Sequence, residues 1–361
     1  MIFPACANCS ESGAEPHLRR KPGVDAGAEP CKGSDPSESA PDEASGVERM
    51  SGRLWTDDFK LDAGKILVKK TGHRIVPDLA LAHSIFIWFC FYFFVQTWRT
   101  SRLLSGHKRP TIAFYPDKPR PWYFIWSVMH VSGAKLVDDI ATADIVMHFD
   151  DSTECSDFMP VVKPGAHVLN FKCNDITKSR VAAAFEMASG QSLAVDPTTF
   201  TGRMVEKSEM NAAHDGRILE GPLDAPVEGK SYQRLIDNEI SGGLVEDLRC
   251  CLVGGSPVVV FRKRRPLERR FLNENVQVLL DEPRNCYSQD EIRVIEAFAA
   301  EIGLDWGGVD VLRDRATGKI FIVDANKTDM GPPVALKLGA KLRATRRMAR
   351  AFAEKFATKK R

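Results

Sequence analysis

The stretch "WGGVDVLRDRATGKIFIVDAN", residues 306–326, contains two apolar, strand-like runs joined by the turn sequence "RATGK". Such a short connection predicts an antiparallel hairpin. Since side chains alternate along a strand, Asp324 and Asn326 should share one face. Pairing then places Asp310 opposite the same end of the hairpin. The stretch therefore predicts two carboxylates and one amide oxygen on a single face of a sheet.

Hard oxygen ligands in this arrangement suit Mg²⁺, with Mn²⁺ as an alternative metal. Magnesium takes its remaining oxygens from water and from nucleotide phosphates, so few protein ligands are needed. Taken singly, Asp324 could merely begin a turn and Asp310 could be solvated. Because both interrupt otherwise apolar strands, the sequence favours a metal site formed by Asp310, Asp324 and Asn326.

The composition is that of a soluble globular protein of roughly two domains. The chain has 361 residues, of which 43% are hydrophobic and 27% charged, and its formal net charge is +2. A charge so near zero argues against a nucleic-acid partner. Nine cysteines, including the adjacent Cys250 and Cys251 in an apolar stretch, indicate buried free thiols and a cytoplasmic location.

Residues 1–60 are rich in Glu, Ser, Pro, Gly and Ala, which predicts a disordered extension. Cys6 and Cys9 form a CxxC pair within it. With only Cys31 and His17 nearby, in a segment that has no packing pattern, the sequence does not favour a zinc site there.

A helical segment is expected over residues 61–108, with the hydrophobic stretch "LALAHSIFIWFCFYFFVQTW" at residues 79–98. The stretch is long enough to span a bilayer, although it contains His83 and Gln96 and its aromatic residues are spread throughout. Three alternatives stay open: a membrane anchor, an interfacial helix, and a helix buried against the protein body or a partner. An attachment to the cytoplasmic face of a membrane is thus one alternative, and oligomer formation is another open question.

The remaining chain predicts an α/β (α+β) fold in two parts. Residues 109–175 alternate short apolar strands with helical stretches, which indicates a small parallel sheet. Residues 176–361 begin with a helix that ends at Gly190, continue with hairpin-like strands, and contain an amphipathic helix over residues 290–302. A basic helix over residues 334–357 closes the chain.

The strands "GVDVLRD" and "GKIFIVDAN" resemble the closing half of an ATP-grasp domain, as found in ribosomal-protein glutamate ligases and other carboxylate–amine ligases. The resemblance covers about residues 175–357. It implies an ATP-grasp domain over residues 176–361, preceded by a small α/β pre-ATP-grasp domain. Asp324 departs from the pattern, because the family usually has glutamate at this position.

The resemblance also implies further site residues. The segment "VEDLRCCLVGGSPVVVFRKRR" matches an Asp-x-Arg strand followed by a strand ending in arginine, which places Asp247 and Arg249 at the nucleotide and Arg262 at the phosphates. "YQRLI" resembles the hinge that holds adenine, although Arg234 replaces the usual acidic residue. The hinge positions and the remaining cationic positions that the resemblance assigns to ATP are Gln233, Arg234, Leu235, Ile236, Lys178, Lys207 and Arg270.

The implied activity is ATP- and Mg²⁺-dependent ligation, in which a small-molecule carboxylate becomes an acyl phosphate and an amine attacks it. Arg262 and Asn326 are the candidate catalytic residues. Two alternatives remain: a kinase on the same fold that phosphorylates a small molecule, and a non-catalytic ATP-binding module. No sequence feature identifies the substrates.

Overall fold

The computed structural model describes residues 59–62, 64–69, 74–104, 106, 109–211, 213, 215–272 and 275–357. The disordered extension predicted for residues 1–60 lies almost wholly outside these ranges. The first described elements are three short antiparallel strands: β1 (Phe59–Asp62), β2 (Lys65–Val68) and β3 (Arg74–Ile75). The expectation that residues 61–108 are helical is therefore wrong for its first part. A turn at Gly64, whose φ is +73°, connects β1 to β2.

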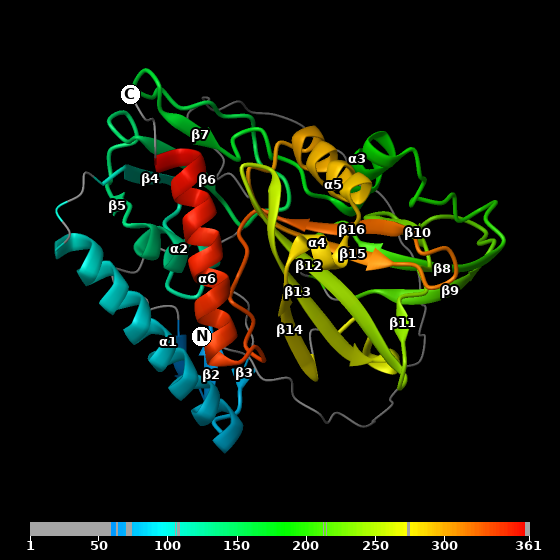
Figure 1. Cartoon of the computed structure of the whole chain (residues 1–361). Helices are drawn as coiled ribbons and strands as arrows, with labels where there is room; N and C mark the ends of the chain where they lie inside the picture. The colour runs from blue at the N-terminus through cyan, green and yellow to red at the C-terminus, as the bar shows by residue number, and fades with distance from the viewer. Residues whose placement is uncertain are drawn as a thin grey trace, which may run out of the picture.

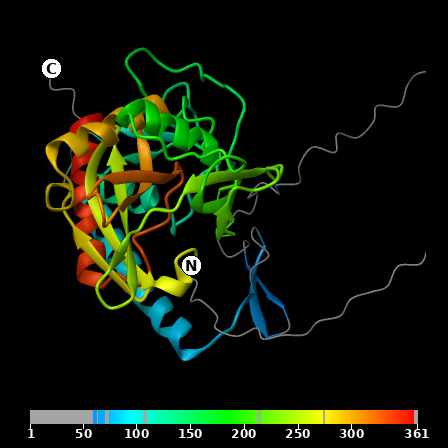
Figure 2. The same ribbon diagram turned by 90° about the vertical axis from the view of Figure 1, so that its right-hand side faces the viewer.

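Helix α1 (Leu79–Leu104) follows these strands along one edge of the molecule (Figure 1). Leu81, Phe91 and Val95 lie on the face that is buried, and α1 packs against α2 (Phe124–Ser132) and α6 (Leu338–Phe352). Figure 2 shows β1–β3 beside the start of α1, at the margin of the body. By length and composition α1 could cross a membrane, and it is the one described helix that meets this criterion.

The predicted parallel sheet is confirmed. Its four strands run in the order β5-β4-β6-β7 and all pairings are parallel. The strands are β4 (Thr111–Pro116), β5 (Lys135–Leu136), β6 (Ile145–Phe149) and β7 (His167–Leu169). All five residues of β6 are buried, as expected for a strand that is covered on both faces.

A helix and a three-stranded sheet come next. Helix α3 (Lys178–Ser189) begins after Thr177, whose side chain accepts a hydrogen bond from the Arg180 amide, and ends at Gly190 with φ of +69°. The antiparallel sheet has the order β10-β8-β9. Its strands are β8 (Gly202–Ser208), β9 (Arg217–Gly221) and β10 (Lys230–Arg234).

The largest sheet is antiparallel, with the order β14-β13-β12-β15-β16 and with β11 pairing β12. Its strands are β11 (Glu239–Ile240), β12 (Leu244–Val253), β13 (Ser256–Pro266), β14 (Gln277–Asp281), β15 (Trp306–Arg313) and β16 (Ile320–Asn326). The helical elements along this part of the chain are η2 (Leu267–Arg269), α4 (Pro283–Cys286), α5 (Gln289–Glu301), α6 and the terminal turn η3 (Ala353–Ala357).

The large sheet separates two hydrophobic cores. Cys251 on β12 faces one core together with Trp306 and residues of α2 and α6, whereas Cys250 faces the other core together with residues of α3 and α5. Both cysteines are fully buried, as their apolar context predicted. The alternation along β12 therefore places helices on both faces of this sheet (Figure 1).

Asn170, directly after β7, joins the parallel sheet to the large sheet. Its Nδ2 donates to the Trp306 carbonyl at 2.7 Å, and its Oδ1 accepts from the Asp305 and Trp306 amides at 2.8 and 2.9 Å. Asn170 is fully buried and has a left-handed φ of +62°. These bonds fix the position of β15, which carries Asp310, relative to the preceding domain.

Candidate functional site

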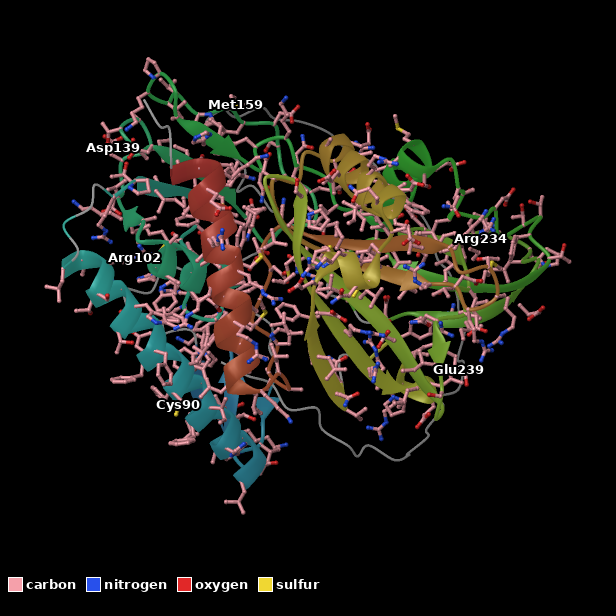
Figure 3. All side chains as sticks on the ribbon, viewed as in Figure 1. Cys90, Arg102, Asp139, Met159, Arg234 and Glu239 are labelled. Atoms are coloured by element: carbon pink, nitrogen blue, oxygen red, sulfur yellow. The ribbon has the colours of Figure 1, made fainter. Side chains whose placement is uncertain are left out.

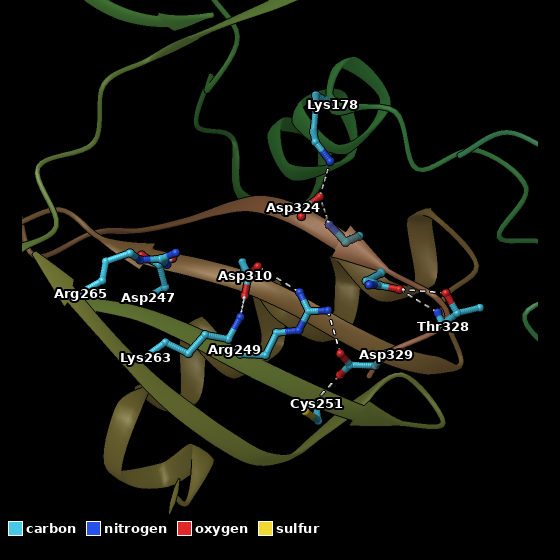
Figure 4. Close-up of polar contacts among 12 residues, drawn as sticks. Lys178, Asp247, Arg249, Cys251, Lys263, Arg265, Asp310, Asp324, Thr328 and Asp329 are labelled. Atoms are coloured by element: carbon cyan, nitrogen blue, oxygen red, sulfur yellow. Dashed lines mark hydrogen bonds and ion pairs between the residues drawn. The ribbon is translucent and has the colours of Figure 1, made fainter. Parts of the chain in front are cut away.

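The hairpin of β15 and β16 forms as predicted. Asp310 is the cross-strand partner of Asp324, and Gly308 is the partner of Asn326. The two aspartates consequently lie side by side on one face of the large sheet (Figure 4).

These aspartates border a cavity of about 180 Å³ between the large sheet and the β8–β10 sheet. Six of its ten charged lining residues are cations: Lys178 from α3, Lys207 from β8, Arg234 from β10 (labelled in Figure 3), and Lys263, Arg265 and Arg270 from β13 and the segment after it. The lining also includes Gln233, Leu235, Ile236, Asp247, Asp310 and Asp324. A polar cavity with so many cations is suited to a polyanionic ligand.

Asp310 is held in its charged form. Burial raises the pKa of its carboxyl, but the positive charges of Arg249, Lys263 and Arg265 outweigh this and keep the pKa well below its usual range. Its Oδ2 accepts from Arg249 at 3.0 Å and its Oδ1 from Lys263 at 3.4 Å. An ionised, partly exposed carboxylate is what a divalent cation requires.

Asp324, one of the predicted metal ligands, forms an ion pair with Lys178, one of the lysines predicted to bind ATP. Its Oδ1 accepts from Lys178 Nζ at 2.6 Å, and also from the Ala325 amide. Lys178 is buried at the start of α3, so this ion pair closes one side of the cavity. Figure 4 shows Lys178 reaching down from its helix toward Asp324.

Lys207 faces the same space from the opposite sheet. Burial lowers its pKa to about 8, even though the negative charge of Asp324 acts in the other direction. Its Nζ donates to Gln233 Oε1 at 3.0 Å, while the buried Gln233 Nε2 has no partner within the described part of the chain. An unpaired buried donor beside a cavity is available to a ligand.

The predicted hinge, residues 233–236, lines the cavity. Arg270 donates to the Ile236 carbonyl at 2.8 Å, which joins the segment after β13 to the hinge. The Arg234 and Leu235 amides donate to the carbonyls of Leu193 and Arg203. The Ile236 amide has no hydrogen bond within the described ranges, so it remains free to bind a ligand.

The prediction that Arg262 belongs to this site is wrong. Arg262 lies on the opposite face of the sheet, where it pairs with Glu246 at 2.7 Å and with Asp281 at 3.4 Å. A bulge between Cys251 and Leu252 explains the difference. A regular hairpin would pair Asp247 with Arg262, but the extra residue moves the pairing to Lys263, and a one-residue shift exchanges the two faces of a strand.

Lys263 and Arg265 are the cavity cations that sequence reasoning missed. Lys263 contacts Asp310, and Arg265 forms an ion pair with Asp247. Both belong to the run "RKRR", so their charge was evident from the sequence. Only the bulge determines which of the four residues face the cavity.

Arg249 and Asn326 lie on the face of the sheet that carries Asp310, but their side chains already have hydrogen-bond partners within the protein. Arg249 is buried behind Asp310, and it bonds both Asp310 and Asp329. Asn326 Oδ1 accepts from the Thr328 amide at 2.8 Å and from its hydroxyl at 3.3 Å. Arg249 therefore positions Asp310, and neither residue lines the cavity.

No family model matches the sequence, and no curated protein matches it. Solved structures do show similarity. One is PsnB complexed with a minimal precursor, Mg and ADP, which is 15% identical with a TM-score of 0.42; the match covers 66% of this chain and 98% of that one. PsnB is an ATP-grasp ligase. A second neighbour is an ATP-grasp RimK domain protein of Sphaerobacter thermophilus, 11% identical over 69% of this chain and 100% of the other, with a TM-score of 0.41.

A third neighbour is the VanG D-Ala:D-Ser ligase of Enterococcus faecalis. It is 11% identical, with 62% of this chain and 74% of that chain covered and a TM-score of 0.39. The predicted mixed α/β architecture is directly visible in the sheets and helices (Figure 1).

Proposed function

We propose that the chain is an ATP- and Mg²⁺-dependent ligase of the ATP-grasp type, which activates a carboxylate as an acyl phosphate for attack by an amine. The supporting observation is the cavity itself. Cations from α3, β8, β10, β13 and the segment after β13 line the same cavity as two paired aspartates, between two sheets. Phosphoryl transfer needs little more from a protein than positioning and charge neutralisation of this kind.

The residues present fit a magnesium site. Asp310 offers an ionised carboxylate and Asp324 lies directly opposite it on the neighbouring strand, and the two would hold the metal when ATP is bound. Bound Mg²⁺ supplies charge neutralisation on the nucleotide phosphates. Asn326 would contribute only through an oxygen that already accepts from Thr328, so we assign it a supporting role.

Different residues of the cavity would bind different parts of the nucleotide. Lys178, Lys207 and Lys263 are placed to bind phosphates, because each is within hydrogen-bond distance of an acidic or amide oxygen at the cavity wall. The free Ile236 amide and Gln233 Nε2 would recognise the adenine edge. Arg270 would hold the hinge in place through the Ile236 carbonyl.

The chemistry has two steps. A carboxylate oxygen of the substrate attacks the γ-phosphorus, the bond to the β-γ bridging oxygen breaks, and ADP leaves. The amine nitrogen then attacks the acyl carbon, phosphate leaves, and the nitrogen loses a proton. The cations stabilise negative charge in both steps, and no covalent attachment to the protein is required.

Hydroxylamine tests this function without knowledge of the amine. The full chain would be incubated with ATP, Mg²⁺ and pools of carboxylic acids. Trapping of the acyl phosphate as a hydroxamate, with equal release of ADP, supports ligation. A stable phosphoester would instead establish the kinase alternative, and ATP binding without turnover would favour a non-catalytic module.

The metal assignment has its own test. Replacing Asp324 and Asn326 together by alanine should weaken Mg²⁺-dependent ATP binding by at least tenfold, because one metal-binding carboxylate is lost. Isothermal titration with and without Mg²⁺ measures this. An unchanged affinity would show that the metal does not bind at this hairpin.

We also propose a cytoplasmic location for the catalytic part. The described cysteines are all free thiols, among them the buried Cys173, Cys250 and Cys251. Free thiols are typical of a reducing compartment. Fractionation of a tagged full-length chain checks this.

A further inference from the structure

We infer that a second metal site, suited to Zn²⁺, lies at the carboxyl end of β6 and is formed by His148, Asp150 and Cys155. One ligand atom from each residue lies within 4.8 Å of the other two. The three residues come from one eight-residue stretch that begins on β6. Ligands commonly bind beyond the carboxyl ends of strands in parallel sheets, so the location is favourable. This site is separate from the hairpin that carries Asp310 and Asp324.

His148 provides an independent indication of a ligand. Its side chain is 6% exposed, and its Nδ1 is buried without a hydrogen-bond partner in the described part of the chain. An imidazole ring nitrogen without a hydrogen-bond partner can offer its lone pair to a metal ion. Unpaired buried polar atoms are rare in folded proteins, and an absent ion is one ordinary reason for them.

Lys327 holds the side chain of Cys155 in place. It is fully buried, and its Nζ donates to Cys155 Sγ at 3.4 Å and to the Cys173 carbonyl at 3.5 Å. A hydrogen-bond donor to a ligand sulfur is a common feature around metal ions.

The donor set of one nitrogen, one oxygen and one sulfur favours zinc over magnesium or calcium. Zinc–ligand bonds of about 2.0–2.3 Å put tetrahedral ligands roughly 3.5 Å apart. Asp150 and Cys155 are both only half-buried. Small rotations of their side chains would bring the ligand atoms from within 4.8 Å of one another to roughly 3.5 Å. Three protein ligands leave a fourth position open to water or to a substrate.

Cobalt is the probe, because Co²⁺ replaces Zn²⁺ and reports a sulfur ligand by charge-transfer absorption. The full-length chain should give this absorption. Cys155→Ser should abolish it, and His148→Ala should weaken Co²⁺ binding by at least about tenfold, the effect that loss of even an outer-shell partner typically has. Cys286→Ser replaces another half-buried thiol and should leave the spectrum intact.

Two outcomes would overturn this site. The first is a spectrum that survives Cys155→Ser. The second is a spectrum that disappears in a Cys6→Ser, Cys9→Ser variant, which would place the metal in the N-terminal CxxC pair. An Asp324→Ala variant should keep the cobalt spectrum, so failure of the proposed ATP site and failure of this site are distinguishable.

Discussion

Arg262 and Lys263 are neighbours in the sequence but lie on opposite faces of β13. Lys263 lines the cavity and contacts Asp310, whereas Arg262 pairs with Glu246 behind the sheet. Lys263→Gln should weaken ATP binding roughly 10- to 100-fold, since a charge-assisted hydrogen bond contributes about 1.5–3 kcal/mol. Isothermal titration measures the affinity.

Arg262→Gln is the matched control for this prediction. It should lower thermal stability slightly, because the bonds to Glu246 and Asp281 are lost, and it should leave ATP affinity within about twofold. Equal losses of affinity in the two variants would contradict the assignment of faces.

Lys207 should make ATP binding depend on pH. Its pKa is lowered from 10.5 to about 8, so the ammonium is lost from the ATP-free protein as the pH rises above 8. Affinity should then fall by up to about tenfold per pH unit. Lys207→Arg stays charged in this range and should flatten the profile. A similar decline in the arginine variant would show that another group titrates.

The same shift has a defined effect on stability. Between about pH 8 and pH 10.5 the unfolded chain binds a proton that the folded chain has lost, so the free energy of unfolding contributed by Lys207 rises with pH. Below pH 8 both states are protonated, and the full cost of burying the charge is present.

At the level of the strand, β15 needs a glycine at position 308. A Cβ atom there would lie 2.5 Å from Asp329 Oδ2 and 2.6 Å from Arg249 Nε, within the buried ion pair that positions Asp310. Gly308→Ala should therefore lower the free energy of unfolding by about 3–5 kcal/mol, the effect of disrupting a buried pair. Urea denaturation measures it.

Gly339, in the first turn of α6, provides the comparison. The nearest atom to an added Cβ is Arg343 Nη1 at 3.6 Å, so alanine fits there. Gly339→Ala should be neutral or stabilise the chain by up to about 1 kcal/mol, because alanine favours helix. If both variants lose stability equally, crowding at Gly308 is not the cause.

At the scale of the molecule, Asn170 joins the parallel sheet to the large sheet. Asn170→Gly removes the hydrogen bonds of the buried side chain to Asp305, Trp306 and Lys327 and should cost about 2–4 kcal/mol of unfolding free energy. Asn170→Ala should cost roughly 1 kcal/mol more, because the left-handed φ of +62° disfavours a Cβ atom. Urea denaturation of both variants gives the values. An alanine variant as stable as the wild type would exclude this linking role.

Local patterns were sufficient where the interacting residues are close in the chain. The helix after Thr177 and its end at Gly190 follow from a capping side chain and a glycine. The pairing of Asp310 with Asp324 follows from a short turn and period-two alternation. The hydrophobic stretch of α1 was equally evident, although not the face of the helix that packs against α2 and α6.

The sequence by itself therefore determined the parallel sheet, the amphipathic helix before β15 and the acidic hairpin. Only the tertiary structure decided which cations meet those acids: Lys178 reaches Asp324 across 146 residues of chain, and the extra residue that β13 inserts in its pairing with β12 turns Lys263 rather than Arg262 into the cavity. It likewise brought Lys327 to Cys155. The physical reason is that register and packing between distant segments depend on the whole assembly of sheets and helices, which no local periodicity specifies.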